Sequence, residues 1–177
     1  MSRLRGLVWM GLLAALLLGA PAAHGEDINA LGTHKVFLPL QLREEAASPE
    51  QRVIELTNAQ RAAAGCPPLA ISPALMQAAA AHSQDMAARN YFSHIGPDNS
   101  TPSTRAVQSG FTPYTIIAEN IAAGYATADA VVAGWMASPE HRGNILNCSL
   151  REIGVGYAHS ESATFRDYWT QSFGTRP

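Results

Sequence analysis

The residues best suited to chemistry lie in three separate segments, and each supplies an imidazole or a carboxylate. His94 stands at the entry to a turn-rich loop, Glu119 interrupts the apolar run TIIAENIAAG, and Glu140 and His141 follow a Ser-Pro pair. A carboxylate flanked by isoleucine and alanine must reach water, a partner or a cation, because burial of an unpaired charge is costly. Neutral imidazoles and carboxylates together suit a divalent cation such as Zn²⁺, with water completing the coordination.

The segment GWMASPEHRGNIL, residues 134–146, also has a simpler interpretation. Its Ser138-Pro139 pair is typical of a helix start, where Glu140 in the first turn interacts favourably with the helix dipole. No short motif joins the three segments, since the chain lacks H-E-x-x-H, G-x-S-x-G and G-x-G-x-x-G patterns and a P-loop. A catalytic cluster, a metal site and a polar helix start therefore remain open from the residues alone.

Composition and charge exclude some partners. The 177 residues fit one domain, and the formal net charge of −2 gives no basic surface for nucleic acid. Lys35 is the only lysine, so a polybasic membrane-binding surface is not expected either. We predict a protein that binds no nucleic acid and is a monomer.

The first residues have the layout of a secretory signal peptide. In residues 1–25 two arginines precede an apolar run that is too short for a comfortable membrane span, and small residues follow. Residues 26–47 mix charged residues, glycine and proline without a period and predict a flexible lead-in. We expect a folded domain over 48–177, secreted to the extracellular space or the periplasm, with no membrane span after signal removal.

Export gives the two cysteines, Cys66 and Cys148, a structural role. An even number of cysteines in an oxidising compartment favours a disulfide. This bridge would close a loop of roughly 80 residues and stabilise the fold by about 4 kcal/mol by restricting the unfolded chain. The alternative is a reactive thiol, which needs a cysteine with no partner. A disulfide leaves no cysteine to act as nucleophile or ligand.

Ser-Pro pairs and apolar periodicity define the expected elements. Three Ser-Pro pairs mark helix starts, the first with the capping-box pattern Ser48-Pro-Glu-Gln51. The tail alternates apolar residues around the polar turn SESA, as expected of two strands. The segment TIIAENIAAG is expected to be short and extended or irregular. We predict an α+β fold with helices near 49–64, 73–89, 103–108 and 128–137, and strands over 152–158 and 165–173, the latter carrying Phe165, Trp169 and Phe173.

Several longer stretches resemble one known family in the same order. They are LTNAQRAAAGCPPL, AHSQDMAARNYFSHIGPD, AENIAAGYATADAVVAGWMASPEHRGNIL, EIGVGY and YWTQSFG. Together they are similar to the bacterial branch of the CAP superfamily, whose SCP domains occur in cysteine-rich secretory proteins, insect venom allergens and plant pathogenesis-related proteins. The resemblance covers residues 48–174. It implies an α-β-α sandwich in which helices cover a small antiparallel sheet.

The resemblance also implies a cavity lined by two histidines and two acids. His94 of FSH corresponds to the first histidine, Glu119 of AEN to the first acid and His141 of EHR to the second histidine. The second acid of longer relatives falls on Ser138 here, with Glu140 nearby as its substitute. His94, His141 and Glu119 are the expected ligands of Zn²⁺ or another divalent cation.

The function implied by the resemblance is binding, since relatives carry sterols and other lipids or act as extracellular interaction modules. We expect a lipid or another extracellular molecule, or a protein partner, in an apolar groove beside the polar cavity. The alternative is a metal-dependent hydrolase or protease, and a structural envelope protein is a third possibility.

Other polar residues are interpreted as structural. His82 lies on the second predicted helix and is expected to be buried and hydrogen-bonded, whereas Asn58 and Arg61 are expected to bind backbone and lock the first helix. Trp135 and Trp169 are expected in the core, because large aromatic side chains supply much of a small core's buried area.

Overall fold

The computed structural model describes residues 47–177, so the expected signal peptide (1–25) and the lead-in up to residue 46 lie outside it. In the described part, helices come first and two long strands last, which confirms the α+β class. No helix there is both long enough and apolar enough to cross a bilayer. The elements are α1 (Pro49–Ala63), β1 (Ala70–Ile71), α2 (Pro73–Arg89), α3 (Pro102–Gln108), β2 (Ile116–Ala123), α4 (Ala128–Ala137), α5 (Pro139–Ile145), β3 (Glu152–His159) and β4 (Asp167–Thr175).

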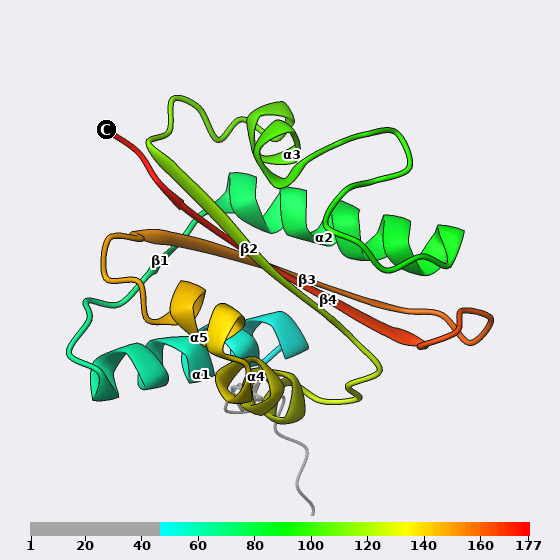
Figure 1. The fold of residues 1–177 in the computed structure, drawn as a ribbon, viewed down its shortest axis with the longest axis horizontal. Coiled ribbons are helices and arrows are strands. Elements are labelled where there is room, and N and C mark those ends of the chain that lie inside the picture. Colours follow the sequence, from blue (N-terminus) through cyan, green and yellow to red (C-terminus); the bar gives the residue numbers. More distant parts are fainter. Residues whose placement is uncertain (1–46) are drawn as a thin grey trace, which may run out of the picture. The chain divides into compact units, whose positions relative to one another are not determined.

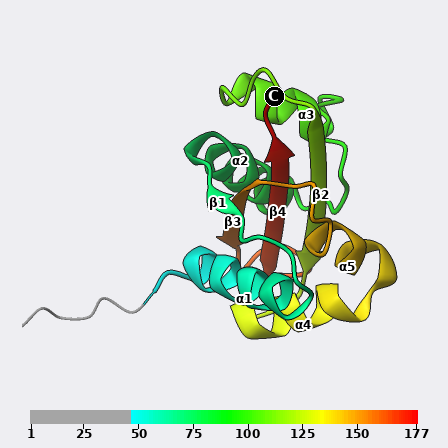
Figure 2. The same cartoon turned by 90° about the vertical axis from the view of Figure 1, so that its left-hand side faces the viewer.

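The strands form one sheet between two layers of helices. The order is β1-β3-β4-β2, with β3 and β2 antiparallel to the central β4 (Figure 2). The two-residue β1 pairs with β3 in parallel, so the predicted antiparallel sheet becomes a mixed one. Helices α2 and α3 lie on one side of the sheet and α1, α4 and α5 on the other (Figure 1). This is the α-β-α sandwich expected from the resemblance.

The two faces of the sheet pack differently. Towards α1, α4 and α5, β3 presents Ile153 and Val155, which join Trp135 and Trp169 in the largest apolar cluster. Towards α2, β3 presents glycines: a Cβ on Gly154 would lie 2.0 Å from the backbone carbon of Leu75. Because β3 carries no side chain there, α2 rests directly on the strand. The core positions predicted for the two tryptophans are confirmed, with each 1% exposed.

The expected helix starts are present, but the Ser-Pro pairs do not all cap alike. Ser48 Oγ accepts a hydrogen bond from Gln51 N at 3.2 Å. Ser72 and Ser138 precede their helices without a side-chain cap. The reciprocal capping box is instead in α3, between Thr101 and Thr104.

The segment around Glu119, expected to be short and extended or irregular, is the eight-residue edge strand β2, so the extended alternative is confirmed. One prediction about strands needs correction. The return strand begins at Asp167 and not at residue 165, because Arg166 has φ 62° and interrupts the extended backbone. Phe165 therefore lies in the turn and is 46% exposed, whereas Trp169, predicted to lie in the core, and Phe173 are buried.

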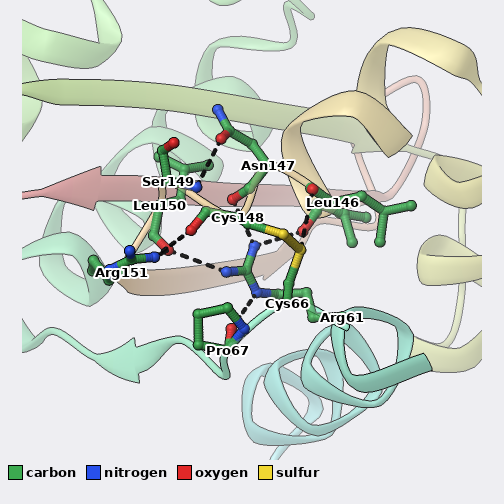
Figure 3. Close-up of a disulfide and its surroundings, with 10 residues drawn as sticks. Arg61, Cys66, Pro67, Leu146, Asn147, Cys148, Ser149, Leu150 and Arg151 are labelled. Carbon is green, nitrogen blue, oxygen red and sulfur yellow. Dashed lines mark hydrogen bonds between the residues drawn. A yellow bond between two sulfur atoms is a disulfide. The ribbon is translucent and has the colours of Figure 1, made fainter. Parts of the chain in front are cut away.

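Arg61 closes the fold on the α1 side of the sheet. Its guanidinium is fully buried and donates to the backbone carbonyls of Pro67, Ile145, Asn147 and Leu150 at 2.8–3.1 Å (Figure 3). Burial, and then the charge of Arg151, lower the pKa of Arg61 from its usual value. The predicted role, binding backbone and locking α1, is confirmed.

The predicted disulfide joins the same region. Cys66 and Cys148 are bonded across 82 residues, with a Cα–Cα distance of 5.0 Å (Figure 3). Asn58 adds a second lock, since its amide donates to Leu69 O at 3.2 Å and accepts from Leu69 N at 2.8 Å. These contacts join α1 to the segments that precede β1 and β3.

Candidate functional site

The edge strand β2 positions the site because consecutive residues point to opposite faces of a sheet. Glu119 faces α3, while the buried Asn120 faces α5 and donates to His141 O at 3.1 Å and Gln171 Oε1 at 3.0 Å. Asn144 of α5 donates in turn to Glu119 O at 3.2 Å and Asn120 Oδ1 at 2.8 Å. Side-chain hydrogen bonds thus dock α5 and its histidine on β2.

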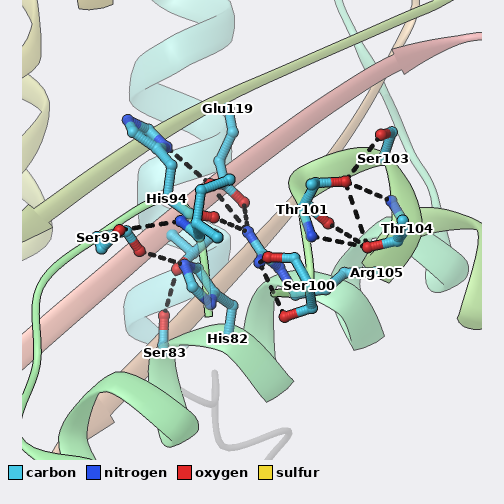
Figure 4. Close-up of polar contacts among 12 residues, drawn as sticks. His82, Ser83, Ser93, His94, Ser100, Thr101, Ser103, Thr104, Arg105 and Glu119 are labelled. Carbon is cyan, nitrogen blue, oxygen red and sulfur yellow. Dashed lines mark hydrogen bonds and ion pairs between the residues drawn. The ribbon is translucent and has the colours of Figure 1, made fainter. Parts of the chain in front are cut away.

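Glu119 forms a buried ion pair with Arg105 of α3. One guanidinium nitrogen, Nη2, lies 3.1 Å from Oε1 and 2.9 Å from Oε2, and the two side chains are 8% and 3% exposed (Figure 4). Arg105 also donates to the carbonyls of His94 and Ser100, both at 3.0 Å. Charge-assisted hydrogen bonds of this kind are the stronger ones in proteins. Arg105 therefore fixes both the acid and the loop that carries His94.

His94 completes this polar unit and reaches solvent. Its Nδ1 lies 2.8 Å from Glu119 Oε1, and its side chain is 47% exposed (Figure 4). A carboxylate can only accept a hydrogen bond, so Nδ1 is the donor. In the neutral ring, Nε2 on the opposite edge is then left as an acceptor for a ligand or a water.

His141 and Glu140 stand apart from this unit. His141 is partly buried on α5 and makes no side-chain hydrogen bond to His94 or Glu119 within residues 47–177. Burial lowers the pKa of His141, the charge of His94 lowers it further and Glu140 opposes both. His141 therefore lies within electrostatic reach of His94, whereas Glu140 is exposed at the surface of α5.

The expected third metal ligand does not fit this geometry. Both oxygens of Glu119 already accept from Arg105, whose positive charge opposes a cation beside it. Over residues 47–177, no group of three or more His, Cys, Asp or Glu side chains is arranged to hold a metal ion. The donors left for a cation are the two imidazoles.

Behind the site, His82 has the structural role predicted for it. It is 1% exposed, and its Nε2 lies 3.0 Å from Ser93 O, next to His94 in the chain (Figure 4). Burial lowers the pKa of His82. A buried neutral histidine thus supports the loop that presents His94.

An apolar cleft lies across the outer edge of β2, beside His141. Its volume is about 290 Å³. Aromatic side chains from three separate segments surround it, and two of them, Phe92 and Phe165, pack edge to face with centroids 6.1 Å apart. The lining residues are Phe92, Ile121, Ala122, Ala123, Tyr125, Gly134, Trp135, Ser138, His141 and Phe165.

Comparison with known proteins identifies the family. Residues 54–173 match the cysteine-rich secretory protein family, CAP. An uncharacterised Bacillus subtilis protein, YkwD, is 44% identical over 124 residues, which are 70% of this chain and 46% of that protein. A crystal structure of an extracellular Bacillus anthracis protein containing an SCP domain has 34% identity and a TM-score of 0.63, covering 73% of this chain and 40% of that one.

A solved structure of lower identity shares the fold. The outer surface protein of Borrelia burgdorferi is 20% identical, with a TM-score of 0.64 and coverage of 71% of this chain and 90% of its own. The chain spans less than half of the two curated Bacillus subtilis relatives, 46% of one and 34% of the other.

Proposed function

Because the chain belongs to the cysteine-rich secretory protein (CAP) family, we propose that it is an exported binding module whose ligand lies in the cleft across the edge of β2. The disulfide between Cys66 and Cys148 and the extracellular relative from Bacillus anthracis support export. The ligand proposed from the resemblance is a lipid or another extracellular molecule.

The observation that carries the proposal is the cleft itself. It combines apolar and aromatic walls with His141 and Ser138 at one end, the composition typical of small-molecule sites. Trp135 is held against β2 by a hydrogen bond from its Nε1 to Ile121 O at 3.2 Å, so that wall is in place before a ligand arrives. Binding to a preformed wall avoids part of the ordering cost.

A hydrolase is the second candidate, and the His94–Glu119 pair favours it. A histidine oriented by a carboxylate, with its second nitrogen towards solvent, has the geometry of a general base. Within residues 47–177, however, no serine, threonine or cysteine side chain is hydrogen-bonded to His94. Binding is therefore the function proposed first. Of the three expected metal ligands, we retain the two imidazoles. We propose that His94 and His141 bind a divalent cation weakly.

Calorimetric titration with para-butylphenol tests the binding function, because this probe combines an apolar body with a single hydroxyl. Phe165→Ala removes an exposed cleft wall and is expected to weaken binding about tenfold, since burial of part of a ring contributes on the order of 1.4 kcal/mol. Ile71→Ala is the matched control: Ile71 is 56% exposed on β1, at the opposite edge of the sheet. Equal weakening in both variants, or no binding to the unaltered chain, would contradict the proposal.

A further inference from the structure

We propose that the cleft takes a small, uncharged, mainly apolar molecule with one hydrogen-bonding group, and that Tyr125, lying over Gly134, sets the size it admits. This ligand class and this specificity-determining residue rest on the binding function proposed above.

The lining carries no permanent charge. None of the ten residues named above for the cleft is Asp, Glu, Lys or Arg. The buried cation of α3, Arg105, does not line the cleft and is already paired with Glu119. An ionised group on the ligand would lose water without gaining a partner of opposite charge, which is costly.

The polar groups of the cleft suit a single hydroxyl, ether or carbonyl. Ser138 precedes α5 without a side-chain cap, so its hydroxyl is not used by the helix. His141 offers its ring, whereas Trp135 Nε1 is already used by Ile121 O. These groups lie at the α5 end of the cleft, so the ligand's polar group is expected there and its apolar body between the aromatic walls.

The edge of β2 disfavours an added peptide strand at this place. A strand would need the outward carbonyls of β2. Ile121 O accepts from Trp135 Nε1, and Glu119 O accepts from Asn144 Nδ2 at 3.2 Å. Because these acceptors are occupied, a small molecule fits the cleft better than an extended chain.

Tyr125 is the wall that determines size. A Cβ on Gly134 would lie 2.6 Å from the Tyr125 hydroxyl oxygen and 2.7 Å from Cζ, so the ring end rests directly on α4. Trp169 Nε1 donates to Tyr125 O at 2.7 Å and fixes the backbone, while the residue remains 37% exposed. The Tyr125 ring is thus a wall of the cleft that stands on a fixed backbone. With about 290 Å³ against roughly 300–1,000 Å³ for common ligand sites, the cleft is small.

A series of para-alkylphenols from ethyl to octyl tests the size limit by calorimetry. Affinity for the unaltered chain is expected to rise about fourfold per added CH₂ while the chain is being buried, and to stop rising once the cleft is full. Tyr125→Ala should move that limit to longer chains. Gly134→Ala adds a methyl group on α4 that displaces the Tyr125 ring, so it should also change the chain length at which affinity stops rising. The control Ile71→Ala should leave that chain length unchanged. Urea unfolding of each variant verifies that it is folded.

Two charged analogues test the ligand class. Para-butylbenzoate and para-butylphenyltrimethylammonium should each bind at least about tenfold more weakly than para-butylphenol, about 1.4 kcal/mol. Tighter binding of either charged probe overturns the class, and a limit unmoved in Tyr125→Ala overturns the role of that residue. If alkylphenols bind without any limit, the size claim alone is wrong. If none binds, the binding function is wrong, and the ligand class with it.

Discussion

Two arginines, Arg61 and Arg105, are buried in this protein, but their hydrogen-bond partners differ in kind. Arg61 donates only to backbone carbonyls, beside the disulfide and away from solvent (Figure 3). Arg105 pairs with an acid, Glu119, whose other partner is the half-exposed His94 (Figure 4). The comparison shows that burial alone does not separate the two arginines. What separates them is that every partner of Arg61 is backbone, whereas the contacts of Arg105 lead through Glu119 to a side chain that reaches solvent.

The largest loss of stability is expected on substitution of Arg61, whose hydrogen-bond partners are all backbone carbonyls. Arg61→Met leaves four carbonyls without their donor and should lower the free energy of unfolding by about 5 kcal/mol, because unsatisfied buried polar groups are costly. Urea denaturation measures this. Arg52→Met, which removes an exposed arginine paired with Asp129, should leave the midpoint nearly unchanged. Similar losses in both variants would contradict the structural role of Arg61.

Removing the disulfide comes next in size. Replacing Cys66 and Cys148 together by serine should cost about 4 kcal/mol, because the unfolded chain regains the freedom of an 82-residue loop. Alkylation of the unreduced native protein should meanwhile find no free thiol in residues 47–177. Two readily alkylated thiols would show that the bridge is absent.

The Arg105 region should respond to substitution in its chemistry as well as in stability. Arg105→Gln breaks a buried ion pair, which is expected to cost about 3 kcal/mol, and it frees Glu119 as a ligand beside His94. Zn²⁺ should then bind at least about tenfold more tightly to the variant than to the unaltered chain, a gain of about 1.4 kcal/mol. Calorimetry measures both affinities, and Arg61→Lys is the control in the other region. We argue that the Arg105 guanidinium keeps a metal ion away from Glu119. This would be contradicted if the unaltered chain bound zinc tightly and Arg105→Gln bound it equally well.

The smallest effect concerns pH. Burial lowers the pKa values of His82 and His141 below the ordinary 6.5, so the unfolded chain binds protons first as the pH falls. Their contribution to stability is complete above about pH 6.5 and is lost progressively below it. Asp167 and Glu161 raise the pKa of the exposed His159. The contribution of His159 to stability is therefore lost as the pH rises, and salt should weaken it by screening these charges.

Unfolding midpoints measured across this range at low and high salt separate the two effects. His82→Gln should flatten the loss of stability on the acidic side, whereas His159→Gln should leave that loss in place. If the acidic slope is unaffected in His82→Gln, the buried neutral histidine is not its source.

The sequence contains different amounts of information about the two arginines. Arg61 lies in LTNAQRAAAGCPPL, where a helix ends before Cys-Pro-Pro, so exposed carbonyls nearby were to be expected. Arg105 lies in the polar run TPSTRA, and its partner Glu119 is fourteen residues away on another element. A buried arginine and a surface arginine look alike in such a run. The ion pair was therefore missed, although His94 and Glu119 were placed by their motifs.

The helices and strands were also predictable only where their sequence signals are local. Helices with Ser-Pro starts and apolar periods were predicted closely, because their signals are local. The two-residue β1 was missed, because it exists only through its pairing with β3. The exposed position of Phe165 depends on the positive φ of Arg166. Arginine rarely adopts a positive φ, so its residue type gives no signal for this turn. An apolar groove was expected from the resemblance, but the residues that line the cleft could not be predicted, since they come from three parts of the chain.

Mapping a bound ligand by amide NMR tests the central claim, that the cleft at the outer edge of β2 binds a ligand while the Arg61 region only stabilises the fold. On addition of para-butylphenol, the account predicts shifts confined to the residues that line the cleft, including 121–123 of β2, Tyr125, His141 and the Trp135 indole N–H. Arg61 and the segments whose carbonyls it binds should be unchanged. Shifts centred on the Arg61 and disulfide region, with a silent β2 edge, would contradict it.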